Sequence, residues 1–157
     1  MGVFSIDCGV QNLSRTKNQR IPRIMVDTGS EATWIPRPVL ESLGVAREKR
    51  DVAFRMANGQ VVTRNVGFAV IHVGKDFTVD EVVFADKEDC ALLGARTLEG
   101  LNLMVHPREK KLVAAGPRVA ASARKNASGN HGEMSSGTQE GTQTLQCGQQ
   151  ASEAQPL

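Results

Sequence analysis

The sequence predicts a mainly β domain followed by a polar C-terminal tail. Short apolar segments rich in valine, isoleucine and phenylalanine recur through the first two thirds of the chain, and clusters of turn-forming residues separate them. The pair Asn58 and Gly59 lies between two such segments, which is a strong hairpin signal. Residues 90–93 form an apolar run that is too short for a helix and lacks alternation, which is typical of a strand buried on both faces.

The N-terminal elements follow from alternation and from turn residues. Residues 2–13 alternate loosely, as an edge or half-buried strand does, and the polar residues 12–20 predict a loop that returns into a strand at 21–26. Pro38 is suited to the first turn of a short helix, and Gly44 is suited to end it.

The remaining elements are also predicted from apolar periodicity and turn residues. A hairpin is predicted over residues 53–73, with a type I′ turn at Asn58-Gly59 because both central residues of that turn need positive φ. The other predicted elements are a strand at 77–85, one or two helical turns at 97–101, and a final hairpin that pairs 102–105 with 111–113.

One turn carries a candidate catalytic group. An apolar strand runs directly into Asp27, Thr28, Gly29 and Ser30. Gly29 allows the backbone to turn sharply and bring N–H groups near the Asp27 carboxylate, while Thr28 offers a hydroxyl that ties the loop down. The alternative is that Asp27 merely ends a strand, because aspartate, serine and glycine are ordinary turn residues.

Two motifs together resemble the retropepsin-like (retroviral-type) aspartic proteases. They are the apolar segment that ends in DTGS at residues 27–30 and the apolar run that ends at Gly94. In that family the second run passes beside the catalytic loop. The letters DTGSEATWIP at residues 27–36 also resemble the pepsin-type loop. The resemblance covers about residues 3–114 and implies a closed antiparallel β-barrel of the retropepsin type with one or two short helices.

The resemblance implies an aspartic endopeptidase that acts on a peptide or an unfolded protein. A chain of 157 residues with only Asp27 in such a loop needs a second copy to supply the second carboxylate, so a homodimer is implied. One ionised carboxylate takes a proton from water and one neutral carboxyl donates to the carbonyl oxygen. At about 3 Å and an effective dielectric near 20, two charges repel by on the order of 5 kcal/mol, so the pair shares one proton, as in other aspartic proteases.

The same resemblance assigns roles to neighbouring residues. It implies that Thr28 bonds across the dimer axis. It also implies that Gly29 and the hairpin residues Ala57, Asn58 and Gly59 line the substrate backbone, the hairpin being the flap that closes over substrate. This chain has no tyrosine and its hairpin tip is not glycine-rich, so its flap departs from both the pepsin-type and the retroviral patterns.

Ser30 and Glu31 complete the predicted site. Glu31 is assigned to the substrate-binding residues, and it lies where retroviral enzymes have an acid that pairs with an arginine directly after the second glycine. Here Ala95 follows Gly94 and Arg96 comes one residue later, so that ion pair is shifted or missing. The Ser30 hydroxyl is expected to donate to the catalytic carboxylate, as in the pepsin-like loop, with capping of its own turn as the alternative.

Composition disfavours other classes of function. The formal net charge is +2 with both signs interspersed, which argues against nucleic-acid binding. Three cysteines and three histidines are scattered without ligand spacing, so we predict no metal, no other cofactor and inert reduced thiols. There is no run of 18 apolar residues and no secretory signal, which predicts a cytoplasmic protein without membrane association.

The sequence divides into a protease-like domain at residues 1–116 and a tail at 117–157. The tail consists mostly of alanine, serine, glycine, glutamine and threonine, which bury too little apolar surface to offset the entropy of ordering, so it is predicted to be disordered. The alternative function is a non-catalytic dimerisation or peptide-binding module in which Asp27 is vestigial. The intact DTGS set favours the enzyme.

Overall fold

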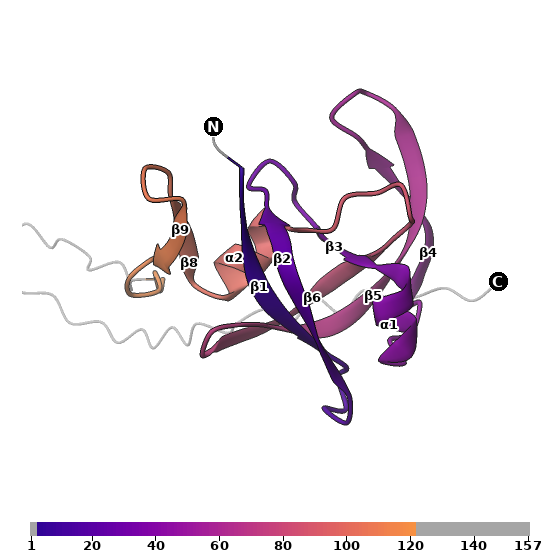
Figure 1. The fold of residues 1–157 in the computed structure, drawn as a ribbon, viewed down its shortest axis with the longest axis horizontal. Coiled ribbons are helices and arrows are strands. Elements are labelled where there is room, and N and C mark those ends of the chain that lie inside the picture. Colours follow the sequence, from indigo (N-terminus) through magenta and orange to yellow (C-terminus); the bar gives the residue numbers. More distant parts are fainter. Residues whose placement is uncertain (1–2, 122–157) are drawn as a thin grey trace, which may run out of the picture. The chain divides into compact units, whose positions relative to one another are not determined.

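Figure 1 shows a computed structural model of the chain, which describes residues 3–121. Strands dominate this part, and each of the two helices has six residues. In chain order the elements are β1 (Phe4–Gln11), β2 (Asn18–Val26), β3 (Thr33–Pro36), α1 (Arg37–Ser42), β4 (Lys49–Arg55), β5 (Val61–Val73), β6 (Asp76–Ala85), β7 (Leu92–Leu93), α2 (Ala95–Gly100), β8 (Leu103–His106) and β9 (Lys111–Ala114).

Six strands form a near-closed ring. They pair in the order β1, β2, β7, β3, β6 and β5, and β5 pairs again with β1, while β4 extends the sheet beyond β5. The β1–β5 contact runs from Gly9 paired with His72 to Gln11 paired with Val70. The predicted mainly β fold with two short helices is therefore confirmed. The sheet is not purely antiparallel, because β7 pairs parallel to β2 and β6 pairs parallel to β3.

All six strands of the ring contribute to one apolar core. The residues that share this core lie on alternate positions of the long strands, as period-two burial requires. They include Val10, Ile24, Ile35, Ile71, Val82, Phe84 and Leu93, each at most 2% exposed. Because every ring strand has a side chain in the same core, the strands hold the loops at their ends in fixed relative positions.

The β4–β5 hairpin forms where it was predicted, but the type I′ turn is wrong. Gly59 has φ +84°, whereas Asn58 does not have a positive φ. The Gly59 N–H donates to the Met56 carbonyl at 2.9 Å and the Met56 N–H donates to the Gln60 carbonyl at 2.8 Å. These bonds define a three-residue loop, in which an ordinary turn is followed by one left-handed glycine.

Two other boundaries differ from the prediction. The second apolar run contains only Leu92 and Leu93 as a strand, and Cys90 before it is exposed. Helix α2 begins at Ala95, two residues earlier than predicted. Its early start has a tertiary cause, because carbonyls of the Asp27 loop accept its first N–H groups, as described below.

The final hairpin β8–β9 forms as predicted, as a two-stranded sheet of its own. The chain continues to make contacts after Ala115: the Asn102 side chain donates to the Gly116 carbonyl at 2.7 Å, and Arg118 donates to the Gly100 carbonyl at 2.8 Å. Most of the predicted tail, from residue 122 onward, lies outside the described residues. Neither helix of residues 3–121 has the length and hydropathy needed to cross a membrane.

Candidate active site

Asp27 lies at the start of the loop that joins β2 to β3. The Gly29 N–H donates to Asp27 Oδ1 at 2.9 Å, and the Ser30 N–H donates to the Asp27 carbonyl at 3.3 Å. The predicted approach of a backbone N–H to the carboxylate is therefore present. Asp27 is half-buried, whereas Thr28 and Gly29 are exposed. The loop thus presents a carboxylate, already oriented by its own backbone, toward solvent.

The second apolar run holds this loop at both ends. Strand β7 pairs with β2, and the ladder continues as the Asp27 N–H donates to the Leu93 carbonyl at 3.0 Å. At the other end the Ala95 N–H donates to the Ser30 carbonyl at 2.7 Å, and the Arg96 N–H donates to the Glu31 carbonyl at 3.2 Å. The first N–H groups of α2 have no partner within the helix, so the loop carbonyls satisfy them.

Gly94 is required at the point of closest approach. A Cβ atom at Gly94 would lie 2.3 Å from the Ala32 carbonyl oxygen and 2.9 Å from the Glu31 carbonyl oxygen. Real Cβ atoms do not approach backbone this closely, so only glycine lets the second run pack against the Asp27 loop. The glycine of the motif therefore has a steric role.

The structure corrects two predicted roles of hydroxyl groups. The Ser30 hydroxyl donates to the Ala32 carbonyl at 2.9 Å and not to the Asp27 carboxylate, so the capping alternative holds for Ser30. Within residues 3–121 the Thr28 hydroxyl makes no hydrogen bond, so it does not tie the loop down inside one chain. It is exposed and available to a second copy, where its predicted bond across the axis stays a prediction.

Glu31 has only a long ion pair. Arg96 Nε lies 4.0 Å from Glu31 Oε1, and Glu31 is 81% exposed at its side chain. Arg96 makes a shorter contact with Glu81 Oε2, at 3.2 Å. Of the two outcomes left open by the sequence, the ion pair is shifted and not missing, and an exposed pair of this length contributes little. Backbone hydrogen bonds hold this part of the loop instead.

The hairpin β4–β5 contacts the strand that leaves the Asp27 loop. Phe54 on β4 meets Trp34 on β3 edge to face, with ring centroids 5.0 Å apart. The tip residues Ala57, Asn58 and Gly59 are exposed. In Figure 1 the hairpin tip and the β2–β3 loop both project toward the upper side of the ring. The hairpin predicted to be the flap thus projects on the same side of the ring as the β2–β3 loop, which carries Asp27.

A buried polar chain beside Gly94 was missed by sequence reasoning. Thr33 on β3 and Thr97 on α2 are both fully buried, and their hydroxyl oxygens lie 2.6 Å apart. The chain extends to the Gly94 N–H at one end and to Asp80 on β6 at the other. The only sequence signal was one threonine in each of two short elements, which is too common to be specific.

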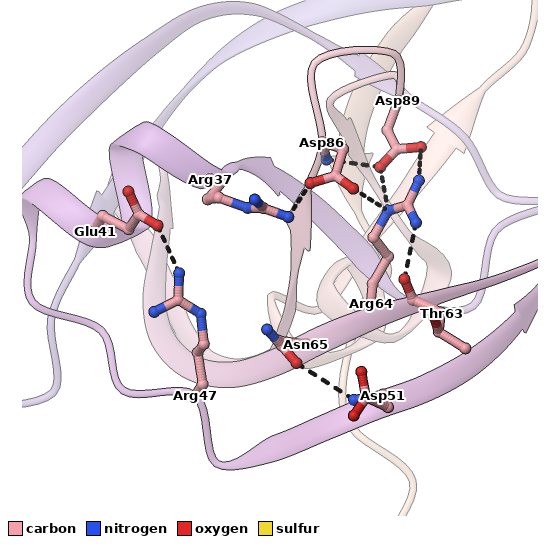
Figure 2. A network of polar contacts seen from close by, with 9 residues as sticks. All are labelled: Arg37, Glu41, Arg47, Asp51, Thr63, Arg64, Asn65, Asp86 and Asp89. Atoms are coloured by element: carbon pink, nitrogen blue, oxygen red, sulfur yellow. Dashed lines mark hydrogen bonds and ion pairs between the residues drawn. The ribbon is translucent and has the colours of Figure 1, made fainter.

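An ion-pair network holds the loop that leads into β7 (Figure 2). Arg64 on β5 donates from Nε to Asp89 Oδ2 at 2.7 Å and from Nη2 to Asp89 Oδ1 at 2.9 Å. Asp86 lies between Arg64, at 3.2 Å, and Arg37 on α1. The side chains of Arg64 and Asp89 are 16% and 6% exposed. The hydrogen bond from Arg64 lowers the pKa of Asp89, against the opposing effect of burial.

We expect Arg64→Met to lower the free energy of unfolding by about 1 to 2 kcal/mol near neutral pH, because it leaves the partly buried Asp89 without its cation. Asp89 has a folded pKa below its ordinary 3.8, so the pair stabilises above that pH and its contribution is lost as pH falls through the folded pKa. The difference between variant and wild type should therefore shrink below about pH 4. Urea unfolding at several pH values measures it, and a difference that is independent of pH would contradict this account.

The cysteines and histidines form no cluster in the described residues. No three side chains among histidine, cysteine, aspartate and glutamate gather as metal ligands within residues 3–121. Cys8 is buried, and burial raises the pKa of its thiol to about 12, which makes it unreactive as predicted. Cys90 is exposed, so burial does not protect it, and Cys147 lies outside the described residues.

Three features define a retropepsin-like domain. They are the ring of strands, the Asp-Thr-Gly loop, and a second apolar run that packs against this loop at a glycine. The sequence matches the family described as gag-polyprotein putative aspartyl protease over residues 14–100. The chain belongs to this family. The matched residues include the Asp27 loop, the β4–β5 hairpin and β7, which confirms the resemblance found in the motifs. No curated protein sequence matches the chain significantly.

Proposed function

We propose that this chain is an aspartic endopeptidase that acts as a homodimer and hydrolyses peptide bonds with a water molecule activated by two Asp27 carboxylates. One observation carries the proposal: in a member of an aspartyl protease family, the Asp27 loop is intact, is held at both ends by β7 and α2, and faces solvent.

The loop geometry supports the chemistry of a shared carboxylate pair. Oδ1 of Asp27 accepts the Gly29 N–H, whereas Oδ2 accepts no hydrogen bond within residues 3–121. The free oxygen is available to water and to the second carboxyl group. With one proton on the pair, the ionised group takes a proton from water while the neutral group donates to the substrate carbonyl oxygen. Gly29, Glu31 and the flap residues 57–59 are proposed to contact the substrate.

The second carboxylate requires a second copy of the chain. The exposed tip of the loop, including Thr28, is one proposed contact, and the separate sheet β8–β9 is another. A two-stranded hairpin with free edges is a weak element unless it pairs further, and Met104 on β8 is 52% exposed. These features support pairing between copies around a twofold axis.

We expect the chain truncated after Ala121 to remain a dimer, because residues up to Arg118 contact the domain whereas a polar tail offers little to bury. Truncation after Ala115 should weaken the β8–β9 region, because it removes the contacts of Gly116 and Arg118 with Asn102 and Gly100. Sedimentation at micromolar concentration measures both. A monomer in the longer truncation would contradict the proposed interface.

The alternative is a non-catalytic module that binds peptides or dimerises. Incubation of the full chain with an unstructured protein at mildly acid pH tests the two, with cleavage followed by mass spectrometry. A peptide in which a hydroxyethylene group replaces the scissile amide should inhibit cleavage with one molecule bound per two chains. Absence of cleavage, together with peptide binding at one molecule per chain, would favour the module.

A further inference from the structure

A chain of hydrogen bonds runs from β6 to the glycine that supports the Asp27 loop. The Gly94 N–H donates to Thr33 Oγ1 at 2.9 Å, the two threonine oxygens lie 2.6 Å apart, and Thr97 Oγ1 donates to Asp80 Oδ2 at 2.7 Å. Asp80 is itself fixed, because its Oδ1 accepts the Glu81 N–H at 2.8 Å. The elements joined in this way are β3, β6, α2 and the link between β7 and α2.

The direction of every bond in this chain is determined. Each hydroxyl has a single hydrogen, and that of Thr97 is directed to the Asp80 carboxylate, which can only accept. Thr97 oxygen must therefore accept from the Thr33 hydroxyl, and Thr33 oxygen in turn accepts the Gly94 N–H. Every hydrogen bond in this chain has one direction, and the chain ends at a carboxylate. The position of the Gly94 N–H is therefore fixed more strictly than it would be by one hydrogen bond to a freely rotating hydroxyl.

Asp80 is half-buried, but the two hydroxyl groups and the Gly94 N–H are inaccessible to water. Thr33 and Thr97 are 0% exposed and Gly94 is buried, so water cannot replace a lost hydroxyl without a rearrangement. Gly94 also lies between the two residues that hold the Asp27 loop. The Leu93 carbonyl accepts the Asp27 N–H, and the Ala95 N–H donates to the Ser30 carbonyl. A shift of Gly94 would consequently move both ends of the loop.

We propose that Asp80, Thr97 and Thr33 are positioning residues that hold Gly94, and through it the Asp27 loop, in the geometry that catalysis needs. The inference rests on the proposed endopeptidase function. None of the three residues touches the substrate in this account. They act through the backbone of Gly94, so their loss should reduce kcat by a larger factor than it changes KM.

The test uses Thr33→Val and Thr97→Val in the full chain, each of which keeps the side-chain shape and removes the hydroxyl. We expect kcat to fall by roughly tenfold to a hundredfold and KM to change by a much smaller factor, because a small displacement of a reacting group has effects of this size. Thr97→Ser keeps the hydroxyl, so its kcat and KM should equal those of the wild type. Thr63→Val, at an exposed position of β5, is the matched control and should change neither constant.

Amide hydrogen exchange tests the same chain independently of activity. In Thr33→Val and Thr97→Val, exchange should accelerate at Gly94, Asp27 and Gly29, while Ile71 in the core of β5 keeps its wild-type rate. Equal acceleration at all four amides would show a merely structural role and overturn the proposal, as would unchanged kcat in both variants.

Asp80→Asn replaces the valine variants in this test if they fail to fold. Asparagine has one oxygen for two donors, so this variant should also accelerate exchange at Gly94. If the wild type cleaves nothing, the proposed function fails, whereas the exchange pattern still decides whether the chain positions the loop.

Discussion

Asp27→Asn is expected to abolish peptide hydrolysis and to leave the fold and the dimer intact. Asparagine has the same shape, and its amide oxygen can still accept the Gly29 N–H. It cannot take a proton from water, however, and loss of general-base catalysis alone lowers rates by about 10² to 10⁴-fold. Steady-state cleavage of a peptide found in the wild-type digest measures kcat/KM. Asp51→Asn is the matched control, because that aspartate is exposed and lies on β4.

Mixed dimers test whether one active site uses the Asp27 carboxylates of two chains. Chains of wild type and Asp27→Asn, unfolded in equal amounts and refolded together, should retain about a quarter of the wild-type activity, because only dimers of two wild-type chains have both carboxylates. Retention of about half the activity would mean that each chain carries its own site. That result would contradict the proposed homodimeric mechanism even if Asp27→Asn alone were inactive.

Gly94→Ala is expected to eliminate most activity and to lower the free energy of unfolding by about 3 kcal/mol, at the upper end of the effects of overpacking. The added Cβ would lie 2.3 Å from the Ala32 carbonyl oxygen and 2.5 Å from its carbon, and both are backbone atoms that cannot rotate away. Relief requires that the Asp27 loop and β7 move apart, which stretches the bonds at Leu93 and Ala95. Thermal unfolding and kcat measure the two effects.

The matched control for this substitution is Gly9→Ala in β1. A Cβ there would lie 3.4 Å from the His72 Cβ, which is ordinary contact, and Gly9 does not have a positive φ. The control should keep wild-type activity and stability within about 0.5 kcal/mol. Equal behaviour of the two alanine variants would show that the close approach at Gly94 does not determine the loop position.

Features with local causes could be predicted from the sequence. Turn residues between apolar segments indicated the hairpins at Gly59 and in β8–β9, and Pro38 with Gly44 indicated the short helix α1. The Asp27 loop was also predictable, because the bond from Gly29 to the carboxylate closes within three residues. The motif at Gly94, distant in sequence, was found through the family resemblance and not through any local propensity.

The sequence by itself determined the β class and the Asp27 loop, since these depend on periodicity and on turn chemistry. Only the tertiary structure decided the partner of each polar group. Ser30 was assigned to Asp27 but bonds Ala32, and the first turn of α2 moved to Ala95 because loop carbonyls accept its N–H groups. The pairing of Thr33 with Thr97 joins residues on separate elements, and no pattern in one strand specifies it, because a hydroxyl bonds to whichever group the packing of the core brings within reach.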